Sequence, residues 1–187
     1  MSRIDELATQ YKDHISVPWQ QGLPAANRVL MLVYEKELER QLRAKLLEFE
    51  QATTSAGHGW QLVDLTTAFA DWMGRMKYRE EYFERPDDIR LKLDSSFLRH
   101  VADLIKAQLS QDTDNDNDVV ALLGAGSLFG FLRLSDVIKE VEREIQGRLV
   151  VFFPGQKDEN NYRLLDARDG WNYMAVGITR HPTGAVA

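Results

Sequence analysis

The sequence of 187 residues contains no cysteine. A chain without thiols forms no disulfide bond, no cysteine zinc site and no iron–sulfur cluster, and it has no thiol nucleophile. Long apolar runs are lacking too, because the longest, residues 119–132, is interrupted by Ser127 and is too short to cross a bilayer. The first ten residues contain no apolar segment of the secretory-signal type. We therefore expect a soluble, cytoplasmic protein with no membrane segment.

Positive charge is in the minority. Lysine and arginine total 23 residues against 29 aspartates and glutamates, which gives a formal net charge of −6. Strong sequence-independent binding of nucleic acid requires clustered cations, so we do not expect strong direct binding of DNA or RNA. Arg75, Lys77 and Arg79 form a local basic patch, which a solvated helix face explains more simply than a nucleic-acid site.

The composition is that of a folded protein, with 44% hydrophobic and 28% charged residues. At about 150 residues per domain, the length predicts a single domain over residues 1–187. Within it we expect an N-terminal helix over 1–17, an acidic loop over 110–118 and a flexible tail over 181–187.

Short apolar runs alternate with amphipathic segments along the chain. Continuous apolar runs of this length are typical of strands that are covered on both faces of a parallel sheet. The predicted strands are residues 28–34, 60–65, 119–123, 149–153 and about 173–179. The alternation predicts an α/β fold, a mainly parallel sheet of about five strands with helices on both faces, in a Rossmann-like three-layer sandwich. The strand order is not predicted.

Two polar segments are expected to be plain connections. One is residues 77–88, between two predicted helices, and the other follows Pro154 and Gly155, which are expected to close the fourth strand.

A glycine-rich turn, GAGSLFG, follows the third predicted strand. Its spacing, G-x-G-x-x-x-G, misses the dinucleotide-binding fingerprint by one residue, and no GxxxxGK[ST] P-loop occurs in the sequence. Free backbone amides at the start of a helix can still hold an anion. Gly124, Gly126, Ser127 and Gly130 therefore form a candidate anion-binding turn, placed where open α/β sheets bind ligands.

Ser127 also occupies the strand-to-helix position of an esterase nucleophile. Asp166 or Asp169 and then His181 follow it in the order of the α/β-hydrolases, but Phe129 stands where that motif requires a small residue. A capping role for Ser127 is the simpler interpretation. A hydrolase, or an enzyme that binds phosphate or a nucleotide through the turn and these aspartates, is the alternative function.

Metal-binding patterns are incomplete. Asp112, Asp114 and Asp116 are spaced as in a calcium loop, but Asn117 replaces the required glycine and Leu123 the required glutamate. The 4 histidines are scattered, without a second ligand at metal spacing. We therefore expect no metal, no cofactor and no catalytic residue.

The segment 160–179 combines polar and aromatic side chains densely. Arginine, tryptophan and tyrosine contribute most of the binding energy at protein interfaces. We therefore select Tyr162, Arg168, Trp171 and Tyr173 as candidate partner-binding residues. An internal lock, with Arg168 paired to an aspartate and Trp171 closing the sheet edge, explains them equally well, and the two roles can coexist.

Three long stretches, residues 28–73, 119–155 and 160–179, resemble the BrxB proteins of bacterial BREX phage-defence systems. The resemblance implies a small cytoplasmic subunit of a multi-gene system that restricts phage and methylates host DNA through other subunits. These include the methyltransferase PglX, the alkaline-phosphatase-like PglZ and the large ATPase BrxC. The resemblance brings no catalytic motif, and it implies a non-catalytic adaptor or scaffold that binds other BREX proteins, PglZ first and then BrxC or PglX.

Overall fold

The computed structural model describes residues 2–110, 116–167 and 170–179. Its main sheet runs in the order β2-β3-β4-β1-β7, and all neighbours along this path are parallel. The strands are β1 (Val29–Tyr34), β2 (Gly59–Asp64), β3 (Asp118–Leu123), β4 (Arg148–Asp158) and β7 (Val176–Ile178). The predicted α/β class and mainly parallel sheet are confirmed.

The strands in the middle of the sheet are buried on both faces. In β1, all six residues are buried. Leu30 and Leu32 belong to one hydrophobic core, whereas Met31 and Val33 belong to the other. Because successive side chains of a strand point to opposite faces, an unbroken apolar run supplies both cores at once.

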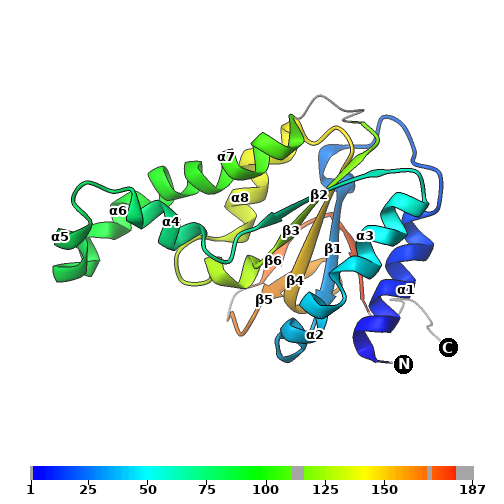
Figure 1. Cartoon of the computed structure of the whole chain (residues 1–187), viewed down its shortest axis with the longest axis horizontal. Helices are drawn as coiled ribbons and strands as arrows, with labels where there is room; N and C mark the ends of the chain where they lie inside the picture. The colour runs from blue at the N-terminus through cyan, green and yellow to red at the C-terminus, as the bar shows by residue number, and fades with distance from the viewer. Residues whose placement is uncertain (1, 111–115, 168–169, 180–187) are drawn as a thin grey trace.

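Helices cover both faces, as Figure 1 shows. One core is closed by α1 (Arg3–Ile15), α2 (Glu39–Ala44) and α3 (Leu46–Ser55), and the other by α4 (Ala68–Gly74), α7 (Leu98–Leu109) and α8 (Leu134–Val141). The predicted three-layer sandwich is thereby confirmed. The described part of the chain contains no helix that could span a lipid bilayer.

The fourth strand does not end at Pro154 and Gly155 as predicted. β4 continues to Asp158 and pairs antiparallel with β5 (Asn161–Leu164), which in turn pairs with β6 (Trp171–Asn172). The turn between β4 and β5 places Glu159 at φ 51°, a conformation usually given to glycine or asparagine. The usual sequence signal of a tight hairpin is therefore missing at this turn. We call β4, β5 and β6 beyond Pro154 the hairpin extension.

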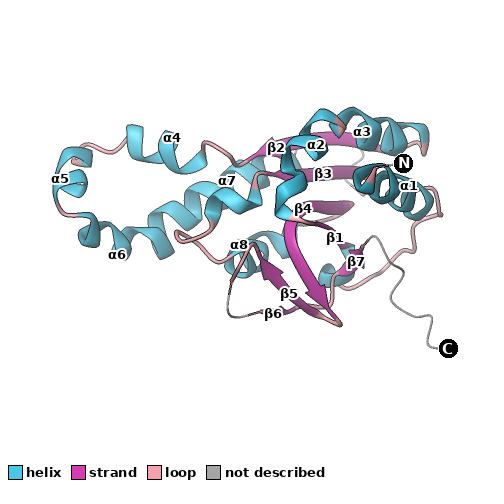
Figure 2. Ribbon diagram, turned by 90° about the horizontal axis from the view of Figure 1, so that it is seen from below, coloured by secondary structure: helices cyan, strands magenta, loops and turns pink. Residues whose placement is uncertain are grey.

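The polar segment of residues 77–88 is not a plain connection either. It contains α5 (Arg79–Glu84), a 3-10 turn (Pro86–Ile89) and the short α6 (Arg90–Lys92). Figure 2 shows α4, α5 and α6 extending away from the sheet, with α5 at the far end. None of residues 74–92 is buried. We call these residues the arm.

The remaining segment predictions fall partly outside the described residues. The helix expected over 1–17 is α1. Of the acidic loop expected over 110–118, residues 111–115 lie outside the described part of the chain, and Asp118 already begins β3. The predicted tail, residues 181–187, also lies outside it.

Candidate functional site

Polar side chains meet where β1 and β2 end. Arg43, on α2, donates from Nε to Glu39 Oε1 at 2.8 Å, from Nη1 to Asp64 Oδ2 at 3.2 Å and from Nη2 to Thr66 Oγ1 at 2.8 Å. Asp64 accepts in addition from the backbone N of Thr66 at 3.0 Å and from its hydroxyl. The hydroxyl of Tyr34, the last residue of β1, donates to Glu39. The end of β1 and the end of β2 with its following loop are thus tied to one helix.

The charges of this network satisfy one another. Burial acts to raise the pKa of Asp64, but the hydrogen bonds from Thr66 and the charge of Arg43 outweigh it and lower that pKa. Burial acts to lower the pKa of Arg43, but Glu39 and Asp64 raise it overall. Burial raises the pKa of Tyr34, and Glu39 raises it further. The arrangement holds the loops in place, and the guanidinium group of Arg43 is already hydrogen-bonded to protein groups.

The network predicts a pH-dependent contribution to stability. Because folding lowers the pKa of Asp64, its carboxylate stabilises the fold above the unfolded value of about 4, and this contribution is lost as pH falls through the folded pKa. The free energy of unfolding of Asp64→Asn should therefore be lower than that of the parent at pH 7. The gap should close below about pH 4.

Urea denaturation from pH 7 to pH 3 measures this gap. We expect a small gap, because the Asp64 side chain is 44% exposed. Asp88→Asn, in the arm, is the matched control, since its exposed carboxylate has Arg85, at 3.4 Å, as its one ion-pair partner among the described residues. A gap for Asp64→Asn that widens on acidification would contradict the assignment.

The glycine-rich turn lies beside this network. Gly124 has φ 77°, and a Cβ atom there would lie 2.6 Å from Thr66 Oγ1. Gly124, Gly126 and Ser127 line one cavity of about 330 Å³ together with Lys36, Glu39, Arg43, Thr66, Pro154 and Leu165. Gly130 is not among the residues that line it; it lines two other pockets.

The helix expected directly after the turn begins later. The turn continues only into a single 3-10 turn, Ala125–Leu128, and α8 starts at Leu134. Ser127 therefore does not cap that helix, and the dipole available to an anion is that of one short turn. The cavity's second cation, Lys36, is bonded to Asp166. Anion binding at the turn stays a prediction.

The residues of the alternative hydrolase are only partly within the described chain. Ser127 is half-buried at the cavity, and Asp166, exposed, is bonded to Lys36. Asp169 and His181 lie outside the described residues, as do Asp112 and Asp114 of the calcium-like spacing. In the described residues, no group of three or more His, Asp or Glu side chains is arranged to hold a metal.

The candidate partner-binding aromatics gather on the hairpin extension. Trp171 and Tyr173 are half-buried and stacked, with ring centroids 4.5 Å apart. The Tyr173 hydroxyl donates to Glu142 Oε2 at 3.2 Å, and burial with this carboxylate raises the pKa of Tyr173. The bond from Tyr173 to Glu142 fastens this segment to the turn after α8. The lock predicted between Arg168 and an aspartate is a different contact and stays a prediction. Arg168 lies outside the described residues.

Tyr162 differs from its neighbours because it is only 1% exposed. Its hydroxyl donates to the carbonyl of Ala175 at 3.2 Å, its ring centroid lies 6.3 Å from that of Trp171, and burial raises its pKa to about 12. A buried ring cannot be presented to a partner directly. Tyr162 therefore supports Trp171 from the interior, which corrects its selection as a contact residue.

A cleft of about 580 Å³ separates the hairpin extension from α8. Its apolar floor is formed by Phe153, Tyr162, Leu164 and Trp171, and Arg133, Lys139 and Asp136 also line it. We call it the hairpin cleft. Neither Arg133 nor Lys139 has a carboxylate within 4.0 Å among the described residues. Lys106, on the neighbouring α7, differs because it pairs with Glu144 at 3.0 Å.

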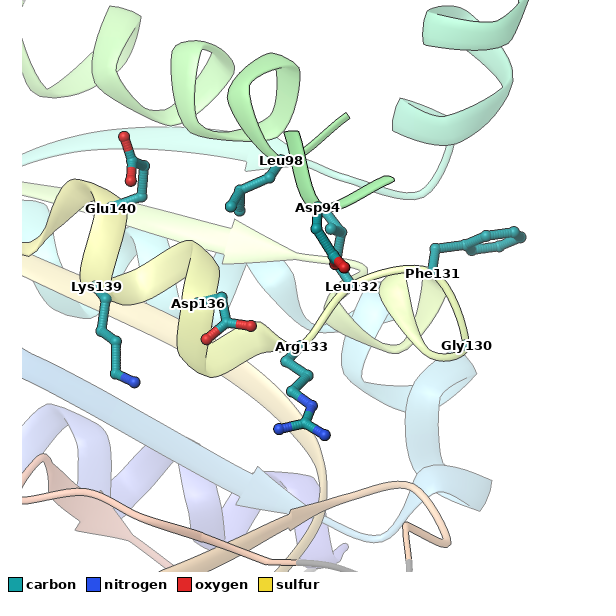
Figure 3. A pocket seen from close by; sticks show the side chains of 9 residues that line it. All are labelled: Asp94, Leu98, Gly130, Phe131, Leu132, Arg133, Asp136, Lys139 and Glu140. Atoms are coloured by element: carbon teal, nitrogen blue, oxygen red, sulfur yellow. The ribbon is translucent and has the colours of Figure 1, made fainter. Parts of the chain in front are cut away.

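A larger, open pocket of about 800 Å³ adjoins the hairpin cleft between α7 and α8. Figure 3 shows that Arg133 and Lys139 extend to the same side of α8, with Asp136 between them. Asp94 and Leu98 line the opposite wall. The two cations therefore border a mixed apolar and charged surface that continues around α8.

Comparison with known families decides what kind of protein carries these surfaces. The family model described as "BREX protein BrxB" matches residues 61–178, more than half of the chain. The chain belongs to the BrxB family. It is thus a component of a BREX phage-defence system, which functions together with other BREX subunits. No curated protein and no solved structure matches this BrxB-family chain.

Proposed function

We propose that this BrxB-family protein is a non-catalytic adaptor that binds other BREX subunits, with PglZ as the first partner to test and BrxC and PglX next. The observation that carries the proposal is the stacked pair Trp171–Tyr173, half-buried beside the hairpin cleft. This cleft has an apolar floor and two cations that no carboxylate in the described part of the chain pairs with. Anchors of this composition, at the edge of a desolvated pocket, contribute most of the affinity at protein interfaces.

The carboxyl edge of the sheet is consistent with this proposal. Enzymes with open α/β sheets keep their reactive groups at this edge. Here Arg43 is bonded to Glu39, Asp64 and Thr66, and Lys36 is bonded to Asp166. These groups stabilise loops, and a free surface elsewhere is the better candidate for function.

The adaptor role predicts a loss of affinity on Trp171→Ala. Removing the ring takes away the stacked anchor, and we expect the dissociation constant for PglZ to rise about tenfold to thirtyfold, which corresponds to ~1.4–2 kcal/mol. Co-purification of the chain with PglZ, BrxC and PglX, followed by calorimetric titration of the partner that binds, measures the effect.

The control is Leu47→Ala, an exposed apolar side chain of α3, on the opposite face of the sheet, which should leave the affinity unchanged. Failure of all three BREX proteins to bind would refute the adaptor role. Parental affinity of a folded Trp171→Ala protein would instead show that the surface lies elsewhere.

One observation favours the hydrolase alternative, namely that Ser127 shares its cavity with Lys36 and Arg43. Phosphatase and esterase assays on the purified protein and on Ser127→Ala test it. Turnover by the parent that is lost in the variant would replace the adaptor proposal with an enzyme.

A further inference from the structure

The arm exposes apolar side chains that no part of its own domain covers. Tyr78 is 55% exposed, Phe83 62% and Leu91 85%. Two separate views place α5 farthest from the sheet (Figures 1 and 2). The connection from β2 to β3 already has a crossover helix in α7, so the arm is not needed to join two parallel strands. Met76, Tyr82 and Ile89 of the arm pack at the margin of one core, but Tyr78, Phe83 and Leu91 stay exposed. Exposed apolar side chains on a projection indicate an intermolecular contact.

Charge is segregated along the arm. Residues 75–79 carry only cations, residues 80–88 are mainly acidic, and residues 90–92 are basic again. Some charges are paired within the arm, as in Arg79–Glu80 at 3.3 Å and Arg90–Asp87 at 3.3 Å.

The charges left over separate in space. Among the described residues, Arg75, Lys77 and Lys92 have no carboxylate within 4.0 Å. Glu81 and Glu84 likewise have no lysine or arginine within 4.0 Å. Arg75 and Lys77 follow α4, and Lys92 ends α6. Figure 2 places α4 and α6 between α5 and the sheet. The far end of the arm therefore keeps unpaired acids and the near part keeps unpaired cations.

We propose that the arm's partner is a second copy of this chain, whose arm lies antiparallel to the first. In this arrangement the acidic α5 of each copy faces the basic near part of the other, and Phe83 packs among Tyr78 and Leu91 of its partner. A two-fold axis makes every such contact twice and closes the assembly at a dimer. The charge pattern is complementary to itself in this antiparallel register alone, because a parallel register opposes like charges.

Sedimentation equilibrium of the full chain tests the dimer. The parent should be dimeric at about 100 µM, and Phe83→Ala combined with Leu91→Ala should raise the dissociation constant at least about tenfold. Both side chains are exposed in the single chain, so the variant should still fold, and a cooperative unfolding transition confirms this. Leu47→Ala, on α3, should remain dimeric.

Charge reversal supplies the second test. Glu81→Lys with Glu84→Lys should be monomeric, and so should Arg75→Glu with Lys77→Glu. An equimolar mixture of the two variants should restore a dimer, because the reversed charges are again complementary. Raising the salt concentration should weaken the parental dimer.

A monomeric parent at this concentration would overturn the proposal, as would a dimer that Phe83→Ala with Leu91→Ala leaves intact, or reversal variants that fail to associate when mixed. Arm-dependent binding of PglZ by a monomeric parent would identify a different occupant and also overturn it. The outcome is separate from the adaptor role, which is tested through Trp171.

Discussion

Gly124→Ala should lower the free energy of unfolding by about 3 kcal/mol or more. The residue has φ 77°, where an L side chain is strained by roughly 1–2 kcal/mol. The added Cβ would also lie 2.8 Å from the backbone N of Thr66 and 3.0 Å from Asp64 Oδ1. To relieve the overlap, the Asp64–Thr66 turn would have to move, and its bonds to Arg43 would break.

Gly130→Ala is a matched control for this prediction. Gly130 has φ 85°, but no atom lies within 4 Å of the position of its Cβ. It should lose only the strain, about 1–2 kcal/mol. Urea denaturation of both variants measures the difference. Equal losses of unfolding free energy in the two variants would contradict the prediction. They would show that the turn after β2 moves away from the added Cβ atom without a loss of stability.

Most of the sheet was predictable because burial on both faces leaves a continuous apolar run. β1, β3 and the first half of β4 each have this pattern, and the structure places all three in the middle of the sheet. The strand order was not predictable, since it depends on contacts between helices and strands far apart in the sequence. β7 was expected to be longer, but only Val176–Ile178 pair with β1.

The two missed elements lack the local signals on which sequence interpretation depends. The turn of the hairpin extension uses Glu159 at positive φ in place of the usual glycine. The arm buries no residue, so it has no apolar periodicity to reveal α5. Both segments were interpreted as connections because their composition is polar.

The candidate site was predictable in its residue types but not in their partners. The sequence places Gly124 and Ser127 after a predicted parallel strand, and both line the cavity beside the Arg43 network. The sequence gives no indication that Arg43, one turn into α2, reaches Asp64 and Thr66. The aromatic segment was recognised, but only burial separates Tyr162 from Trp171 and Tyr173.

The distinct role of Tyr162 leads to a prediction with a large effect. Tyr162→Ala should lower the free energy of unfolding by about 3–5 kcal/mol, as expected for removal of a buried aromatic ring. The ring packs on Phe153, with centroids 5.8 Å apart, and its hydroxyl reaches Ala175, just before β7. Tyr162 therefore fastens the hairpin extension to the edge of the main sheet.

Tyr162→Phe distinguishes a role of Tyr162 in stability from a role in partner binding. It keeps the ring and removes only the hydrogen bond to Ala175, so it should cost about 1 kcal/mol of stability. Because the hydroxyl faces the interior, the variant should bind PglZ with the parental affinity, whereas Trp171→Ala should not. Urea denaturation and calorimetric titration of both variants measure the two effects. If Tyr162→Phe lost affinity while keeping its stability, the hydroxyl would have to reach the partner, and the hairpin extension would have to open on binding.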